Sequence, residues 1–168
     1  MPIKKEKLSN PDLGALIEGL TGAGVKFIIV GGLAAVVQGA PVTTMDVDIV
    51  HSQSYENISR LLKFLKSVEA VYRRPDDKLI EPDKDDFTGK GHVLLSTRLG
   101  PLDILSVIEE GNGYEDLLSH TVAMEFKGRL VRVLSLEKMI DLKERSKDPL
   151  IKKHLPILKE VLRQLDRL

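Results

Sequence analysis

Two aspartates placed one residue apart at the start of an apolar run are the feature that most constrains this chain. Asp46 and Asp48 flank Val47, and the apolar run ends at Val50. Side chains at positions i and i+2 of a strand point to the same face, so the two carboxylates are expected to lie side by side. Adjacent carboxylates repel each other unless a cation lies between them. A divalent cation such as Mg²⁺ is the simplest candidate, because it prefers carboxylate oxygens and leaves room for phosphate oxygens.

A predicted central strand followed by two glycines precedes the aspartates. Residues 25–30 are too apolar for a half-exposed strand. Gly31 and Gly32 follow, and backbone without a Cβ lets a phosphate approach main-chain N–H groups at a helix start. The spacing matches neither the G-x-G-x-x-G fingerprint nor a P-loop. We predict phosphate contacts at this glycine pair. Thr43 and Thr44 are predicted to bind phosphate or ribose, with local turn hydrogen bonds as the alternative.

A third acid lies in a later apolar segment. Asp103 is the single charge in residues 101–105. A charge in such a strand faces solvent, pairs with another charge or binds a metal. If its strand lies beside that of Asp46 and Asp48, three carboxylates converge. Such a site holds two metal ions about 3.5–4 Å apart, which clamp the attacking and leaving oxygens of a phosphoryl displacement.

Hydrophobic periodicity and turn residues predict a chain of mixed helices and strands. The predicted helices cover residues 9–22, 33–38, 54–67, 112–118, 135–146 and 148–165, the first starting at Ser9-Asn10-Pro11-Asp12. The predicted strands cover residues 25–30, 47–50, 92–97, 102–105, 121–126 and 130–134. This order predicts an α+β fold, with helices packed on a sheet and a C-terminal helical layer. We expect a core of residues 1–134 and a helical segment of residues 135–168 within a single domain.

Three details of this pattern have alternative interpretations. Residues 73–91 contain six acidic residues against three lysines and predict an exposed loop with one short edge strand, or a cover over the site. Pro156 should either kink the last helix or begin a new first turn. Residues 137–168 carry nine Lys/Arg and six Asp/Glu, as expected for solvent-facing helices, or for a basic rim that meets an RNA or nucleotide acceptor.

Composition excludes several classes of function. The 168 residues carry 25 basic and 25 acidic side chains, so no overall charge favours nucleic acid or anionic membranes. Aromatic residues make up 4%, too few to indicate a base-stacking surface, and the absence of Cys excludes thiolate chemistry. The four histidines lack metal-ligand spacing and are predicted to be structural. No signal-peptide core or membrane-length apolar run is found, so a cytoplasmic protein without membrane contact is expected.

Taken together, these motifs resemble the nucleotidyltransferase superfamily that includes DNA polymerase beta, and more narrowly its AbiEii-type or minimal nucleotidyltransferases. The resemblance is carried by Gly31-Gly32, Thr44-x-Asp46-x-Asp48, Asp103 and residues 134–143, and it extends from about Leu13 to Leu165. It implies a mixed central sheet and a Mg²⁺- or Mn²⁺-dependent reaction. In that reaction a nucleotidyl group passes from an NTP to a hydroxyl acceptor on RNA, protein or a small molecule. Some relatives are halves of toxin–antitoxin pairs.

The resemblance also implies residue roles and one departure. Asp46 and Asp48 would bind the metal that carries the triphosphate, and Asp103 would help to hold the metal that activates the acceptor. Members of the subgroup often carry Arg two residues before the motif threonine, where this chain has Val42. Lys143 or Arg98 would have to compensate by contacting the nucleotide. Otherwise the alternatives are a catalytically degenerate nucleotide-binding module, or one half of a toxin–antitoxin pair. A metal-dependent phosphohydrolase is a third alternative.

Overall fold

The computed structural model describes residues 11–167, in which seven strands form one mixed sheet of order β3-β4-β5-β2-β1-β7-β6. The strands are β1 (Phe27–Val30), β2 (Val47–His51), β3 (Val71–Tyr72), β4 (His92–Thr97), β5 (Gly100–Leu105), β6 (Thr121–Phe126) and β7 (Arg129–Leu134). The β2–β5 and β1–β7 pairs are parallel, and the other four neighbouring pairs are antiparallel. The fold therefore joins strands that are distant in sequence at its centre.

Six α-helices accompany the sheet within residues 11–167. They are α1 (Leu13–Gly22), α2 (Gly31–Val37), α3 (Tyr55–Ser67), α4 (Tyr114–Leu117), α5 (Leu136–Arg145) and α6 (Leu155–Asp166). Four short 3₁₀ turns are η1 (Lys84–Phe87), η2 (Glu109–Gly111), η3 (Leu118–His120) and η4 (Ile151–His154). The predicted α+β fold, a mixed sheet with helices packed on it and a C-terminal helical layer, is confirmed.

Local capping explains where the longer helices begin. Ser54 accepts a hydrogen bond from the Asn57 amide, and Ser135 accepts one from the Lys138 amide, so α3 and α5 begin where the sequence predicted. Helix α1 begins after Asp12, and the predicted start at Ser9 and Asn10 lies outside the described residues. Pro156 lies in the first turn of α6, which is where its fixed φ and missing N–H are tolerated. The interpretation of Pro156 as a new first turn is therefore correct.

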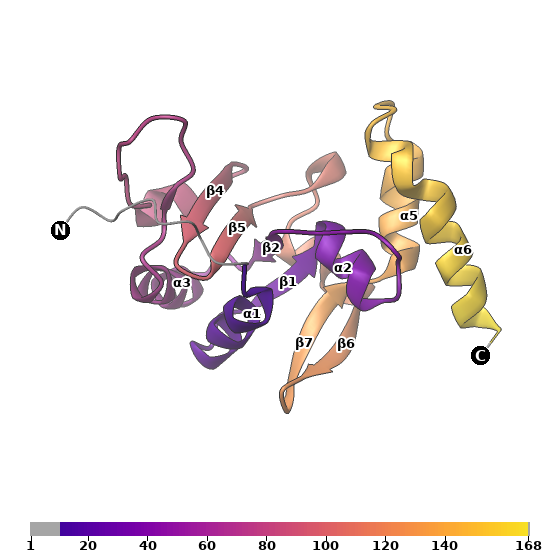
Figure 1. Cartoon of the computed structure of the whole chain (residues 1–168), viewed down its shortest axis with the longest axis horizontal. Helices are drawn as coiled ribbons and strands as arrows, with labels where there is room; N and C mark the ends of the chain where they lie inside the picture. The colour runs from indigo at the N-terminus through magenta and orange to yellow at the C-terminus, as the bar shows by residue number, and fades with distance from the viewer. Residues whose placement is uncertain (1–10, 168) are drawn as a thin grey trace.

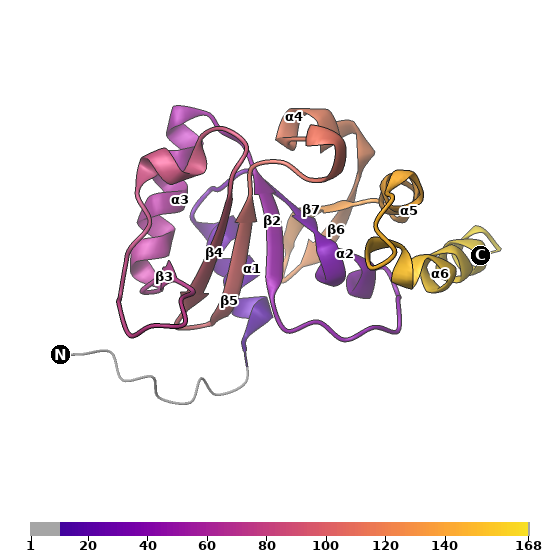
Figure 2. The same cartoon turned by 90° about the horizontal axis from the view of Figure 1, so that it is seen from above.

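The two faces of the central strands differ. Val47 and Ile49 of β2, with Leu102 and Ile104 of β5, are fully buried on one face. In Figure 1, α1 and α3 lie below β4, β5 and β2, and Figure 2 shows α5 and α6 at the opposite end of the molecule from α3. Asp48 and Asp103 alternate with these apolar residues and so point to the other face.

The segment 73–91 is anchored more firmly than an exposed loop. Phe87 in η1 is fully buried, and its carbonyl lies 2.8 Å from Nε2 of the buried His51. Gln53 exchanges two hydrogen bonds with the backbone of Gly89. The prediction of an exposed segment was correct for most of residues 73–91, but the short edge strand expected within them is not found, because β3 ends at Tyr72. The prediction was also wrong for the end of the segment, because the apolar Phe87 outweighs the surrounding charges.

The C-terminal helices follow the sheet directly. Strand β7 ends at Leu134, α5 begins at Leu136, and α5 packs against α6. The division into residues 1–134 and 135–168 stays a prediction. Within residues 11–167, the helices are too short or too polar to cross a membrane.

Candidate active site

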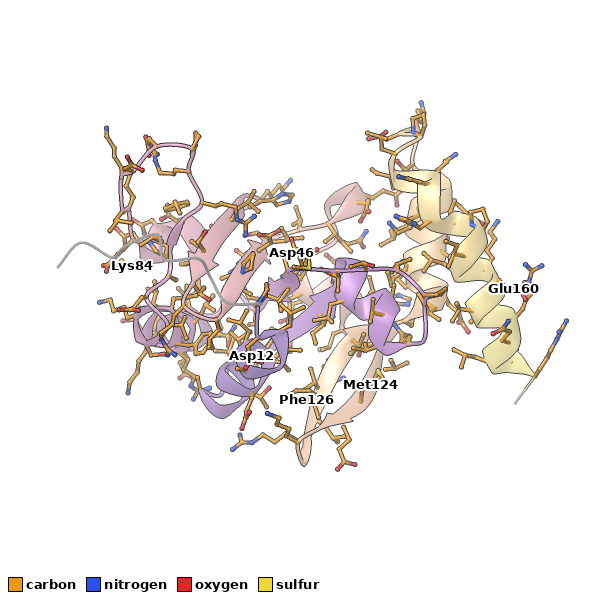
Figure 3. All side chains as sticks on the ribbon, in the orientation of Figure 1. Asp12, Asp46, Lys84, Met124, Phe126 and Glu160 are labelled. Carbon is orange, nitrogen blue, oxygen red and sulfur yellow. The ribbon has the colours of Figure 1, made fainter. Side chains whose placement is uncertain are left out.

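The three predicted carboxylates meet on one face of the sheet. Strands β2 and β5 are parallel neighbours, and Asp48 lies opposite Asp103 in their register. Asp46 lies just before β2 and, being two residues away, points to the same side as Asp48. One oxygen from each carboxylate lies within 4.8 Å of the other two. Figure 3 places Asp46 near the centre of the molecule, between the end that carries α3 and the end that carries α5 and α6.

The electrostatics of this cluster favour a cation. Burial, together with the adjacent carboxylates of Asp103 and Asp46, raises the pKa of Asp48 to about 7, against the opposing effect of Arg73. Burial and the neighbouring Asp103 also raise the pKa of Asp46. Asp48 Oδ1 is buried without a hydrogen-bond partner among the described residues. A buried carboxylate oxygen with no donor is an available ligand atom for a hard divalent ion.

Gly31 is required beside this cluster for two reasons. Its φ of +68° is a conformation that residues with a side chain rarely adopt. A Cβ at this position would also overlap Oδ2 of Asp48 and lie 3.1 Å from its Cγ. The absence of a side chain therefore lets the start of α2 approach the Asp48 carboxylate.

Gly32 and Thr44 are also neighbours. A Cβ on Gly32 would lie 3.2 Å from Thr44 Oγ1, and that hydroxyl donates to the Asp46 carbonyl at 3.2 Å. Thr44 therefore has the local turn bond that the sequence left as an alternative. Thr43 is exposed on the segment before β2.

A cavity of about 450 Å³ opens on the same face of the sheet. Its lining includes Val30 and Gly31 at the end of β1, Leu105 of β5, and Lys143 of α5. Val30 is the register partner of Asp48, and Leu105 lies two residues after Asp103, so these side chains point to the side of the carboxylates. The structure therefore brings Lys143 and Gly31 to one cavity next to the acidic cluster.

Two further cavity residues were not anticipated as site residues. His92 lines the cavity while its Nε2 lies 3.1 Å from the Val107 carbonyl. Glu109 lines it as well, in the turn that follows β5. Most of the remaining lining is aliphatic, so the cavity offers an apolar body with a few charged groups at defined places.

Arg73 is the residue that sequence reasoning missed. Its Nη2 donates to Asp103 Oδ1 at 2.8 Å, which makes it the cation paired with the acidic cluster. The segment 73–91 begins with two arginines, which a charge count limited to its lysines and acids leaves out. The signal that could have found Arg73 is the pair of arginines that precedes the run of acids, although no local pattern indicates which carboxylate they meet.

Arg98 and Lys143, the two residues predicted to compensate for the missing cation at Val42, differ in their position relative to the cavity. Val42 is partly buried and packs against the apolar core. Arg98 donates to the Ser67 carbonyl at 3.4 Å, at the end of α3, and does not line the cavity. Lys143 does line it. Of the two, only Lys143 is placed to meet a ligand there.

Comparison with solved structures identifies the fold. The lincosamide antibiotic adenylyltransferase LnuA, in its lincomycin-bound structure, matches with 14% identity and a TM-score of 0.55, covering 89% of this chain and 96% of that one. ANT(2")-Ia in complex with adenylyl-2"-tobramycin matches with 19% identity and a TM-score of 0.54, covering 90% and 88%. An antigenic nucleotidyltransferase-like protein from Paracoccidioides brasiliensis matches with 17% identity and a TM-score of 0.53, covering 98% and 79%.

These likenesses define the class of fold. The chain has the nucleotidyltransferase fold, as the sequence motifs predicted. No protein-family model and no curated protein matches the sequence. The narrower AbiEii-type subgroup stays a prediction.

Proposed function

We propose that this protein is a metal-dependent nucleotidyltransferase that transfers a nucleotidyl group from an NTP to a hydroxyl on a small-molecule acceptor. The observation that carries this proposal is the meeting of Asp46, Asp48 and Asp103 beside Gly31 and a cavity of about 450 Å³. The same fold is found in two adenylyltransferases. Sharing a fold does not define a reaction, so the proposal rests on the site.

The donor set fits Mg²⁺ or Mn²⁺. Three carboxylates with one buried unpartnered oxygen suit a hard cation, and the described residues include no thiolate that would select a softer one. Asp46 and Asp48 would hold the ion that carries the triphosphate, and Asp103 would help to hold a second one. When bound, the ions supply neutralisation of the charge on the phosphates and acidify the attacking hydroxyl.

The residues of the chain would position the reactants. Gly31 lies against Asp48, and the main-chain N–H groups of Gly31 and Gly32 would bind phosphate. Lys143 lines the cavity and would supply a positive charge there. The acceptor oxygen then bonds to the α-phosphorus, the bond from that phosphorus to the bridging oxygen breaks, and pyrophosphate leaves. Asp103 would take the proton of the hydroxyl. Thr43 and Thr44 lie on the segment that leads into the acids and are proposed to contact phosphate or ribose.

The form of the cavity favours a small acceptor over a macromolecule. A volume of about 450 Å³ with mainly aliphatic walls is typical of small-molecule sites. The chain has no net charge, which removes the usual attraction for RNA phosphates. The solved structures of two similar folds hold lincomycin and adenylyl-2"-tobramycin. An RNA or protein acceptor stays an outcome of the test.

The test is a transfer assay with each α-labelled NTP and Mg²⁺ or Mn²⁺, offered hydroxylated small molecules, total RNA and protein extract in separate reactions. We expect label on a small molecule together with pyrophosphate release, and loss of both in Asp46→Asn. Label on RNA or protein would overturn the acceptor class. Free phosphate without a labelled acceptor would indicate the phosphohydrolase alternative.

The second candidate function is a nucleotide-binding module without turnover, alone or as one half of a toxin–antitoxin pair. Val42 favours it, because the position holds a core-packed apolar side chain where related proteins often carry Arg. Calorimetric titration with NTP and Mg²⁺, run beside the transfer assay, separates the two. Binding without transfer to any acceptor supports the module.

A further inference from the structure

We propose that Arg73 is a positioning residue that holds the Asp103 carboxylate in one orientation for the transfer reaction. The inference rests on the proposed function and adds to it a residue that directly follows β3 at the edge of the sheet. It starts from the contact between the two side chains, in which Arg73 Nη2 donates to Asp103 Oδ1 at 2.8 Å.

The position of Arg73 is fixed by strand β4. Its main-chain N–H donates to the Leu94 carbonyl at 2.9 Å, and Leu94 is the register partner of Asp103. The same Nη2 that binds Asp103 also donates to the Leu95 carbonyl at 2.8 Å. Both the backbone and the guanidinium are therefore attached to β4. The side chain crosses that strand and reaches β5 with little freedom to move.

The hydrogen bond from Arg73 makes the two carboxylate oxygens of Asp103 different from each other, because only Oδ1 accepts it. Asp103 is 14% exposed and Arg73 is 37% exposed, so the pair is partly shielded from water. Oδ1 accepts from the guanidinium, which fixes the plane of the carboxylate and directs Oδ2 elsewhere. Among residues 11–167, the ion pairs include no other cation joined to Asp46, Asp48 or Asp103. Arg73 is thus the one side chain found to restrain the cluster from outside.

Restraint of Asp103 has opposite effects on metal affinity and on turnover. A guanidinium repels a nearby divalent cation and occupies one carboxylate oxygen, so its removal should tighten metal binding. A carboxylate that has lost its orientation serves a reacting hydroxyl less well, so turnover should fall. A purely structural role in holding β3 would instead weaken metal binding, nucleotide binding and stability together.

Arg74 offers a matched control on the next residue. It has a similar exposure of 38%, and it pairs with Asp76 at 2.7 Å in the same segment and with none of the three acids of the cluster. Removal of Arg74 therefore changes the charge of the segment by the same amount without releasing Asp103.

The experiment measures Mn²⁺ binding to the full chain by titration calorimetry, for the wild type and for Arg73→Ala, Arg73→Lys and Arg74→Ala. We expect Arg73→Ala to bind Mn²⁺ about 2–5-fold more tightly, as loss of a partly exposed ion pair allows. Arg73→Lys and Arg74→Ala should stay close to the wild type. In an Asp103→Asn background, the gain from Arg73→Ala should shrink, because the part that comes from releasing the Asp103 oxygen is lost.

Kinetics with the acceptor found in the transfer assay completes the test. We expect kcat of Arg73→Ala to fall about 10–100-fold with KM for the NTP little changed, and Arg73→Lys to recover part of the loss. Unchanged or weaker Mn²⁺ binding in Arg73→Ala, while the wild type binds Mn²⁺, overturns the role of Arg73 alone. Failure of the wild type to bind Mn²⁺ overturns the proposed function itself, and this role with it.

Discussion

Gly31 and Asp48 lie close together in the candidate site. The positive φ of Gly31 and the space left by its missing Cβ allow the Asp48 carboxylate to lie against the start of α2. That same carboxylate carries a raised pKa because it is buried beside two other acids. At the scale of single residues, the site therefore depends on the backbone conformation of Gly31 and on the charge of the Asp48 carboxylate beside it.

Replacement of Gly31 by alanine tests the backbone requirement. We expect Gly31→Ala to lower the free energy of unfolding by about 1–3 kcal/mol, because the residue must adopt a left-handed conformation and displace Asp48. Urea denaturation measures the change. Gly22→Ala is the control, since φ there is not positive and a Cβ would have no neighbour within 4 Å. A loss of similar size in both variants would contradict the special role of Gly31.

The raised pKa of Asp48 predicts a specific dependence of stability on pH. Between pH 3.8, the ordinary pKa of an aspartate, and about pH 7, the folded state holds a proton on Asp48 that the unfolded state releases. The free energy of unfolding of the metal-free protein should therefore fall as pH rises across this window, and level off above about pH 7. Mg²⁺ should remove the decline, because it binds the ionised carboxylates.

The measurement is the difference in melting temperature between the wild type and Asp48→Asn, with a chelator and with Mg²⁺. The difference is needed because His51, whose pKa is lowered by burial, changes stability with pH in the opposite sense. With chelator, we expect the melting temperature of Asp48→Asn to exceed that of the wild type by an amount that grows as pH rises. With Mg²⁺, we expect no such growth. A difference that stays constant with pH would show that Asp48 does not titrate in this range.

At the scale of elements, the segment between β3 and β4 shows how one apolar residue outweighs many charged ones. Its acids and lysines lie at the surface, whereas Phe87 is fully buried against His51, with their ring centroids 5.8 Å apart. The segment also begins with Arg73, which contacts Asp103. Its two ends are therefore attached to the sheet, one near the carboxylates and the other beside β2.

Truncation of Phe87 should release this segment. We expect Phe87→Ala to lower the free energy of unfolding by about 3–5 kcal/mol, the usual cost of removing a buried aromatic side chain. Limited proteolysis should then cleave within residues 73–91 at a higher rate. Leu79→Ala, at a position 51% exposed in the same segment, is the control and should change stability by about 0.5 kcal/mol or less. Equal protease sensitivity of the two variants would mean that Phe87 is not the anchor.

At the scale of the whole molecule, the cavity joins parts of the chain that are far apart in sequence. Gly31, Leu105 and Lys143 come from the first, middle and last thirds of the chain and line one space beside the carboxylates. A ligand that fills this space contacts both the sheet and α5. Ligand binding should therefore stabilise the molecule as a unit.

Thermal unfolding with ligands tests this expectation. With Mg²⁺ and an NTP at about one hundred times the dissociation constant, mass action predicts a stabilisation of about 2.7 kcal/mol. For a chain of this size that corresponds to a rise in Tm of roughly 5–10 °C. We expect Lys143→Ala and Asp46→Asn each to reduce the rise. A full rise in both variants would place the nucleotide away from this site.

The sequence indicated the local features of the site. Alternation within residues 46–50 predicted that Asp46 and Asp48 share one face of a strand. Ser54 and Ser135 marked helix starts that the structure confirms. The glycine pair predicted close approach of a phosphate to the backbone. In this structure, what approaches Gly31 is Asp48. Its contact with phosphate stays a prediction.

These features were readable from the sequence because they depend only on residues a few positions apart, through the repeat of a strand or the first turn of a helix. The tertiary structure alone decided that β5 pairs with β2, that Arg73 reaches across β4 to Asp103, and that Lys143 shares a cavity with Gly31. Each of these contacts joins residues about 30 or more positions apart. Such pairings are set by the burial of the whole apolar core. A local sequence pattern does not indicate which distant residue will be the partner.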